Sequence, residues 1–396
     1  MSVTNKFRNN IKTIFTIFSR TTSNNKFIPE IDGLRFFAIS SVVLFHIFNH
    51  YFLKGGAVVP EGHKVTSFFV HAVSTNFNRG VELFFAISGF ILALPFATSH
   101  IKTTPRPNLK KYFWRRVTRL EPPYVLSLII FFLLNYVTHH NTLSELFPHF
   151  FASFFYVHNF IYPGTLPLIN GVTWSLEIEI QFYILAPLLT SVFMIRNKVN
   201  RRLLILLLIL ISITVNAYLS LNFLSIINYF HFFFIGFLMT DLYLEGNVIS
   251  MNKIKGLAHG AIGAVALFTL FFFPEGDKLS KFVLPLCIGL FFYVCMFSRP
   301  WKTISSFKLL TVIGGMCYSI YLLHVYIIAF VDKLSITQHL PGEFYSKFFM
   351  HIIICLIAIL IISGIYFLAI ERPCMDKDWV KKLMNRLRGS RVTATG

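Results

Sequence analysis

The sequence contains few charged residues, and acidic residues are the scarcest of them. Charged side chains make up 13% of the 396 residues, with 17 Asp and Glu against 36 Lys and Arg. Hydrophobic residues reach 55%, and the mean hydropathy is +0.65. Soluble domains rarely combine these values. The composition therefore argues against a soluble enzyme and indicates an integral membrane protein.

Several motifs that would indicate other functions are absent from the sequence. We find no internal repeat, no glycine-rich phosphate loop and no cleavable signal peptide. The five cysteines do not have metal-ligand spacing, so we expect small apolar side chains and no bound metal. They are Cys287, Cys295, Cys317, Cys355 and Cys374.

Long apolar runs recur along the chain, and each can cross about 30 Å of hydrocarbon as a helix. We therefore expect an all-α polytopic membrane bundle with about ten transmembrane helices. Their expected ranges are 33–53, 80–97, 122–138, 174–195, 203–221, 226–244, 257–273, 281–297, 310–330 and 349–370. The run 146–162 is apolar but short and contains two histidines, so we interpret it as a re-entrant or interfacial segment.

The basic residues predict the orientation of these helices. With the N-terminus in the cytoplasm, inner segments carry 28 Lys and Arg, whereas outer segments and their edges carry 7. This positive-inside bias places both termini in the cytoplasm. It also accounts for the net charge of +19 without nucleic acid as a partner. We expect a cytoplasmic arm over 1–27, a membrane domain in the lipid bilayer over 28–373 and a basic cytoplasmic tail over 374–396.

Ionisable residues inside an apolar span are costly, so each indicates a functional site. The first span contains DGLRFFAISSVVLFHIF, with Arg35 near its cytoplasmic end and His46 deep inside. Their spacing of eleven residues brings both side chains to one helix face, about 16 Å apart along the axis. An interfacial arginine and a core histidine bonded to a neighbouring helix are the alternatives. On the functional interpretation, the pair lines one polar cavity.

The second span begins with RGVELFFAISGF, which places Glu82 at the depth of His46. Glu82 could orient the imidazole, although a solvated carboxylate at a helix start is the alternative. We assign Ser88 and Gly89 to close helix packing, because small residues let two backbones approach.

A basic cluster, WRRVTRLEPPY, precedes the third span and ends in two prolines that we place at a helix start. Arg115, Arg116 and Arg119 fit one turn of a cytoplasmic helix. Guanidinium groups match phosphate geometry. A topology signal or a contact with anionic lipid is the alternative.

Two further spans contain polar side chains. WSLEIEIQFY places Glu177 and Glu179 in a first helical turn, followed by Gln181 and Tyr183. Carboxylates suit a helix N-terminus electrostatically, but we expect at least one of these side chains to line a cavity. In the ninth span, YSIYLLHVY places Ser319, Tyr321 and His324 in the outer half, at the depth of His46.

These motifs, in this order across ten spans, resemble the membrane-bound acyltransferase 3 family. The resemblance covers about 28–373 and is carried by Arg35 with His46, GVELFFAISGF, WRRVTRLEPPY, WSLEIEIQFY and YSIYLLH. It implies transfer of an acyl group, usually acetyl, from cytoplasmic acetyl-CoA to a hydroxyl on an extracytoplasmic sugar, as in O-antigen and exopolysaccharide O-acetyltransferases. The expected location is the inner membrane of a bacterium, with acetyl-CoA as donor substrate and no bound cofactor.

The resemblance also implies roles for individual residues. Arg35 and His46 match an essential pair, and Arg115, Arg116 and Arg119 match a basic motif that holds the CoA phosphates. A Trp-Ser-Leu block is matched by Trp174, Ser175, Glu179, Gln181, Phe182 and Tyr183. His46 then acts as general base, oriented by Glu82 or Glu179, or carries the acyl group itself. Tyr321 and His324 are expected to donate to the developing oxyanion.

The sequence departs from the family pattern at two positions. Glu82 stands where Asp is commoner, and Ile180 stands where a second Glu often follows the first. The chain also ends after the tenth span, so the final transfer step is expected in the membrane domain or on a partner.

Other functions remain open at this stage. A small-molecule acceptor, a succinyl donor, or a transporter or flippase for an envelope precursor would each suit intramembrane ionisable residues. We find no inverted repeat that would favour transport. The outer loops 54–78, 139–173 and 331–348 carry no recognisable sugar-binding signature, so the glycan or lipid-linked glycan acceptor is not specified.

Overall fold

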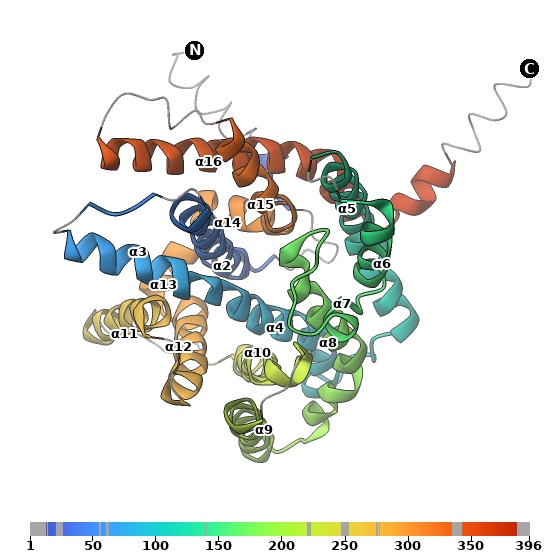
Figure 1. The fold of residues 1–396 in the computed structure, drawn as a ribbon. Helices are drawn as coiled ribbons and strands as arrows, with labels where there is room; N and C mark the ends of the chain where they lie inside the picture. The colour runs from blue at the N-terminus through green and yellow to red at the C-terminus, as the bar shows by residue number, and fades with distance from the viewer. Residues whose placement is uncertain are drawn as a thin grey trace, which may run out of the picture.

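The fold of the chain is all helical in its computed structural model (Figure 1). The structure describes residues 13, 15–20, 27–54, 57–60, 63–138, 141–219, 223–246, 253–274, 276, 278–334 and 343–385. These residues form helices and turns and contain no strand, which confirms the predicted all-α membrane bundle. Most of the predicted arm 1–27 and residues 386–396 of the predicted tail lie outside the described residues. The predicted orientation of the termini remains a prediction.

The element bounds follow the apolar runs of the sequence. In chain order the described elements are α2 (Pro29–Phe48), η1 (Asn49–Lys54), α3 (Lys64–Asn76), η2 (Phe77–Arg79), α4 (Gly80–Ile101), α5 (Leu109–Thr138), α6 (Leu143–Phe154), α7 (His158–Ile161), η3 (Gly171–Thr173), α8 (Trp174–Leu189), η4 (Thr190–Met194), α9 (Lys198–Tyr218), η5 (Ile226–Asn228), α10 (Phe230–Leu244), α11 (Lys253–Phe272), α12 (Lys278–Phe297), α13 (Arg299–Ser305), α14 (Lys308–Gly315), α15 (Cys317–Lys333), α16 (Phe344–Tyr366), η6 (Phe367–Glu371) and α17 (Arg372–Cys374).

Each of the ten expected spans coincides with a helix or helix pair. Within the described residues, seven helices are long and apolar enough to cross a membrane, and α14 with α15 makes an eighth if the bent pair is one span. The other two, α10 and α11, are apolar but shorter. The run 146–162 folds as the short helices α6 and α7, in keeping with its interpretation as a segment that does not span.

The helix α2 lies at the centre of the molecule, with α4, α14 and α15 packed against it (Figure 1). Two glycines allow this close approach. A Cβ on Gly33 would lie 1.9 Å from the carbonyl oxygen of Ser305, and one on Gly314 would lie 1.8 Å from that of Asp32. Backbones therefore touch on two sides of α2, which holds Arg35 rigidly in the core.

The helices α4 and α10 cross at a second pair of glycines. A Cβ on Gly89 would lie 2.2 Å from the Phe233 oxygen, and one on Gly236 would lie 2.3 Å from the Ala86 oxygen. Gly89 therefore has the packing role expected for it. Ser88 does not share that role, because its hydroxyl donates to Glu179 across the site described below.

The two prolines of WRRVTRLEPPY do not begin a helix, and this expectation was wrong. The helix α5 starts at Leu109 and carries Pro122 and Pro123 inside it. Proline lacks an N–H, so Pro122 leaves the carbonyl of Thr118 without its usual helical donor. The indole Nε1 of Trp379 donates to that carbonyl at 2.9 Å. A side chain from the C-terminal segment thus supplies a donor to the carbonyl that Pro122 leaves without one.

The expected span 310–330 is not one straight helix. It is broken into α14 and α15, which meet at an angle of 70°. The break falls at Gly315 and Met316, and the backbone contact between Gly314 and Asp32 fixes α14 against α2. The first turn of α15 therefore begins beside α2, where Cys317 and Arg35 line the same cavity.

Candidate functional site

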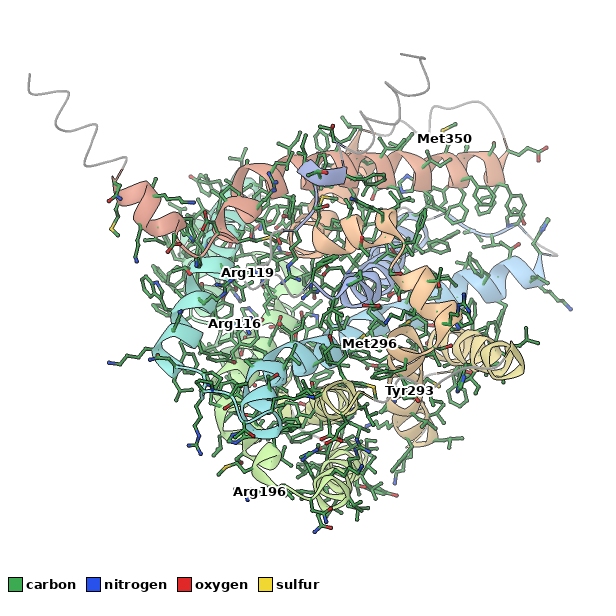
Figure 2. The ribbon with its side chains drawn as sticks, turned by 180° about the vertical axis from the view of Figure 1, so that it is seen from behind. Arg116, Arg119, Arg196, Tyr293, Met296 and Met350 are labelled. Atoms are coloured by element: carbon green, nitrogen blue, oxygen red, sulfur yellow. The ribbon has the colours of Figure 1, made fainter. Side chains whose placement is uncertain are left out.

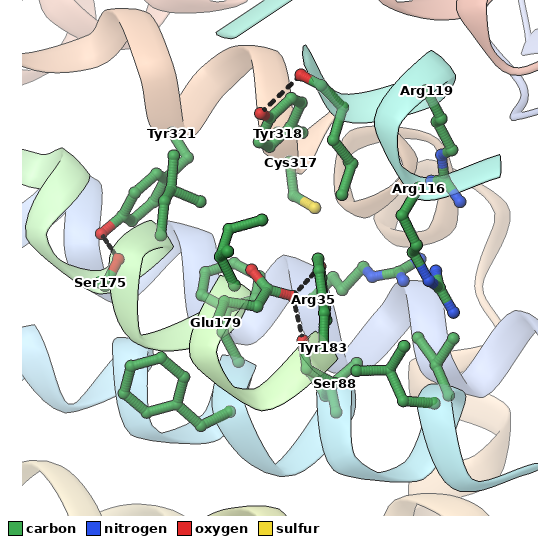
Figure 3. Close-up of a pocket in the computed structure, with 18 of the residues that line it drawn as sticks. Arg35, Ser88, Arg116, Arg119, Ser175, Glu179, Tyr183, Cys317, Tyr318 and Tyr321 are labelled. Carbon is green, nitrogen blue, oxygen red and sulfur yellow. Dashed lines mark hydrogen bonds between the residues drawn. The ribbon is translucent and has the colours of Figure 1, made fainter. Parts of the chain in front are cut away.

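A cavity opens between α2, α4, α5, α8 and the start of α15 (Figure 3). It encloses about 1070 Å³ of empty space, part of which is open to solvent. Its polar wall carries Arg35, Ser88, Arg116, Arg119, Tyr156, Ser175, Glu179, Tyr183, Cys317, Tyr318, Tyr321 and Glu371. Its apolar wall is formed by Val81, Phe84, Phe85, Ile87, Ile91, Leu92, Leu120, Leu176 and Ile180. The cavity therefore suits a ligand with one charged end and a mostly apolar body.

Arginines gather at one end of the cavity. Arg35 from α2 and Arg116 and Arg119 from α5 line it together, and Figure 3 shows all three on the same side. Arg35 is paired with Asp32, three residues earlier on α2, and Arg20 reaches the same carboxylate at 3.2 Å. Asp32 is only 2% exposed, so its carboxylate holds both guanidinium groups from inside the protein.

The three arginines of the basic motif do not share one environment. Arg116 and Arg119 line the cavity, whereas Arg115 is not part of its lining. Figure 2 shows Arg116 and Arg119 on the side of α5 that faces the bundle. The guanidinium of Arg116 lies 5.3 Å from the ring of Tyr112 and 5.4 Å from that of Tyr183. These cation–π contacts hold Arg116 in place while leaving its edge towards the cavity.

Glu179 lies in the middle of the cavity. Its carboxylate accepts hydrogen bonds from Ser88 of α4 and from Tyr183, one turn further along α8. Figure 3 shows Glu179 between the arginine end and Tyr321. The carboxylate thus ties α4 to α8 and gives the middle of the cavity a fixed acceptor.

Tyr321 closes the other end of the cavity. Its hydroxyl donates to the carbonyl of Val172 at 2.9 Å and pairs with the Ser175 hydroxyl at 2.6 Å. Two predicted residues from distant parts of the sequence therefore meet, at the end opposite the arginines (Figure 3).

Two histidines stand beyond Tyr321. The rings of His46 and His324 lie 5.0 Å apart, and the rings of Tyr321 and His324 lie 5.9 Å apart. His324 is fully buried, with Nδ1 facing the carbonyls of Ile320 and Tyr321. A neutral Nδ1–H donated to those carbonyls leaves Nε2 as the unprotonated nitrogen. Neither histidine lines the cavity. Their ring contacts place His324 next to Tyr321 and His46 next to His324, beyond this end of the cavity.

The remaining predicted site residues have other surroundings. Glu82 is half-buried at the start of α4 and does not line the cavity. Trp174 packs on Phe85 and Tyr229. The side-chain oxygen of Gln181 accepts from the Ile226 backbone N–H at 2.9 Å. These contacts join α8 to α4 and to the segment of η5 and Tyr229 that precedes α10, so Trp174 and Gln181 support the wall from outside.

Glu177 also serves the wall and not the cavity. It is 2% exposed and accepts the backbone N–H of Asn159 at 2.9 Å. It thereby holds the start of α7 against α8. Of the two carboxylates in this first turn, Glu179 is therefore the one that enters the cavity.

Sequence reasoning did not single out Asp32, Tyr318 or Glu371. Asp32 had a signal, because an acidic residue three positions before Arg35 on a helix is placed to pair with it. Tyr318 is held by its hydroxyl on the Leu120 carbonyl, at 3.1 Å. Glu371 directly follows the last expected span, 349–370, and had no signal that placed it in the cavity.

A histidine pair lies outside the membrane-spanning helices, at α6 and α7. Nδ1 of His149 and Nε2 of His158 are 3.0 Å apart, and Tyr162 stacks on His149 at 4.0 Å. Burial, with a smaller effect of His149, lowers the pKa of His158 to about 4. Among the described residues, no group of three or more His, Cys, Asp or Glu side chains could hold a metal ion.

Comparisons with known proteins place the chain in a family. A family model described as an acyltransferase domain matches residues 28–368. O-acetyltransferase OatA of Staphylococcus aureus (strain NCTC 8325 / PS 47) is 23% identical over 382 residues, which cover 89% of this chain and 58% of that protein. Peptidoglycan O-acetyltransferase OatA of Listeria monocytogenes is 31% identical over 185 residues, 44% of this chain and 26% of that protein.

The chain spans little more than half the length of the first of these relatives. No solved structure matches it. The family match begins before Arg35 and ends just before Glu371, so it covers nearly the whole cavity. The chain belongs to the acyltransferase domain family.

Proposed function

We propose that the chain is a membrane O-acetyltransferase that moves an acetyl group from acetyl-CoA to a hydroxyl of an extracytoplasmic glycan. The observation that carries this proposal is the polarity of the cavity. Arg35, Arg116 and Arg119 gather at one end, and Tyr321 stands at the other, in front of His324 and His46.

The arginine end suits the phosphates of CoA. At this end and in the middle of the cavity, four guanidinium groups lie near three carboxylates. These groups are Arg20, Arg35, Arg116, Arg119 and Asp32, Glu179, Glu371. The guanidinium groups therefore leave one positive charge in excess, which an anionic ligand can balance. The orientation predicted from the basic residues puts this end on the cytoplasmic side, where acetyl-CoA would enter.

The apolar wall suits the pantetheine arm. That arm is about 15–20 Å long from ordinary bond lengths, which matches the predicted separation of about 16 Å between Arg35 and His46 along α2. The thioester would then lie near Tyr321, with the two histidines on its outer side. The acceptor hydroxyl would approach from that outer side.

Side chains of this protein can supply every proton transfer that the reaction needs. The acceptor oxygen attacks the thioester carbonyl, the new C–O bond forms and the C–S bond breaks. His46 takes the hydroxyl proton and returns it to the CoA sulfur, or carries the acetyl group between the two halves of the reaction. Tyr321 stabilises the oxyanion that develops on the carbonyl when its hydroxyl turns from the Val172 carbonyl towards it. The donor role expected for His324 does not fit, because its N–H faces the carbonyls of Ile320 and Tyr321.

The acceptor proposed from the sequence is a cell-surface glycan such as O-antigen or exopolysaccharide. The name of the Listeria relative adds peptidoglycan to this class. A glycan exposed on the outer side of a bacterial cytoplasmic membrane meets the geometric requirement in each case.

Substitution of His46 tests the proposed function. In a strain that depends on this chain, His46→Ala should remove the O-acetyl signals from the NMR spectra of the surface glycans. The amount of protein in the membrane should stay unchanged. His100→Ala is the matched control, because His100 is also half-buried in a helix but lies in the last turn of α4, outside the group of Tyr321, His324 and His46. Full acetylation with His46→Ala would refute the proposed role of the histidine.

A further inference from the structure

Glu371 is a buried carboxylate that the proposed reaction does not use. It lies at the end of η6, directly after α16, and is 3% exposed. Together with Arg35, Arg116 and Arg119 it lines the arginine end of the cavity. Burying a carboxylate is costly unless its partners compensate, so its position at this end calls for a physical account.

Glu371 contacts the start of α15, the second half of the broken helix. The Glu371 carboxylate accepts the backbone N–H of Ser319 at 3.0 Å and the Ser319 hydroxyl at 2.5 Å. Ser319 lies in the first turn of α15, where backbone N–H groups have no helical partner. Glu371 therefore caps the helix that begins at the 70° break. A neutral amide oxygen would accept the same two bonds.

Glu371 also acts through its negative charge, which a neutral amide would not reproduce. Arg119 and Arg20 both interact electrostatically with Glu371. Arg119 Nε is buried with no hydrogen-bond partner among the described residues, so this guanidinium keeps a donor for a ligand. The carboxylate offsets part of the positive charge that would attract an anionic donor.

This reduction of the positive charge affects both the donor and the product, because both bind the arginines through the same phosphates. Acetyl-CoA and CoA carry the same phosphates, so the arginines bind both equally well. Such uniform binding does not accelerate the chemical step, and it slows the release of product. A carboxylate fixed among the arginines weakens both interactions by the same amount.

We propose that Glu371 is a positioning residue that caps α15 and sets how tightly the arginine end holds CoA, so that the product leaves. This inference rests on the proposed acyl-CoA donor. It assigns to Glu371 a role in turnover that is separate from the chemistry at His46.

The test is CoA binding by the full chain in detergent, read as the rise in melting temperature with CoA concentration. Glu371→Gln keeps an acceptor for Ser319 but removes the charge. It should lower the melting temperature without ligand. It should also tighten CoA binding by on the order of tenfold, as expected for one charge at short range in a partly solvated site. The Ki of CoA as product inhibitor and the KM of acetyl-CoA should fall together.

Two controls separate charge from capping. Ser319→Ala removes one hydrogen bond to Glu371 and leaves the charge, so CoA affinity should stay as in the wild type. Asp241→Asn removes a buried carboxylate that pairs with Arg201 and Arg202 on α9. It should lower the melting temperature without changing the affinity for CoA.

The outcomes are distinguishable. If CoA does not shift the wild type, the proposed donor is wrong. If CoA shifts the wild type but binds Glu371→Gln equally or more weakly, the role given to Glu371 is overturned. Should Glu371→Gln fail to accumulate, it is combined with Arg119→Gln, which removes both charges. The double variant should bind CoA more tightly than Arg119→Gln alone, and equal or weaker binding would overturn the inference.

Discussion

Substituting the arginines of α5 one at a time tests the cavity geometry against the sequence motif. Arg119→Gln removes a guanidinium that lines the cavity, and Arg115→Gln makes the same chemical change four residues earlier, outside the lining. The motif alone gives both arginines the same role. The structure predicts that only Arg119→Gln weakens the donor interaction.

The magnitude follows from the contact that is lost. A hydrogen bond between a charged donor and a phosphate contributes about 1.5–3 kcal/mol, which corresponds to a change of about 10- to 100-fold in donor affinity. Arg119 Nε has no hydrogen-bond partner among the described residues, so this donor is available to a ligand. The effect should therefore appear in ligand binding.

The assay is release of free CoA thiol by the purified chain, with the concentrations of donor and acceptor varied separately. Arg119→Gln should raise the KM for acetyl-CoA within the stated range and leave the KM for acceptor near the wild-type value. Arg115→Gln should change neither by more than about twofold, as is usual for a substitution outside a site. Equal effects of the two variants, or an effect confined to the acceptor, would refute the assignment of the arginine end.

Three further predictions concern the scaffold. Gly89→Ala places a Cβ 2.2 Å from the Phe233 oxygen, so overpacking should lower the stability measured in a thermal melt by about 1–3 kcal/mol. Gly256→Ala is the control and should leave stability unchanged, because there is open space around Gly256. An unchanged melt for Gly89→Ala would contradict the close crossing of α4 and α10. Trp379→Phe removes the donor to the Thr118 carbonyl and should lower stability by about 1 kcal/mol, with no loss if that bond is absent. Because the pKa of His158 is lowered to about 4, the unfolded chain binds the extra proton first. Stability should therefore fall as pH drops from about 6.5 to 4, and His158→Gln should remove that part of the pH dependence; an identical pH profile would contradict it.

The helices could be predicted because membrane spans are set by long apolar runs. Such runs depend on local composition and need no knowledge of neighbouring helices. Helical periodicity predicts that Arg35 and His46 share a face of α2 and line one cavity, but only Arg35 lines it. Ser175 and Tyr321 were found by motif, and the structure adds their hydroxyl contact.

The rest depended on contacts between distant segments. The break before α15 stands beside the close packing of Gly314 on Asp32, a contact that no single run of sequence shows. The carbonyl that Pro122 leaves without a helical donor is bonded by Trp379, from the far end of the chain. Arg115 and Arg116 are neighbours in sequence, and only the position of α5 against the bundle decides which of them enters the cavity.

The most direct test of the account uses the purified full chain with acetyl-CoA labelled on its acetyl group and a glycan acceptor. Label should appear on the glycan as a base-labile ester, with release of one CoA thiol for each ester formed. His46→Ala should stop ester formation while CoA still raises its melting temperature. A folded wild-type chain that binds CoA but neither releases thiol nor labels any glycan hydroxyl would contradict the proposed O-acetyl transfer.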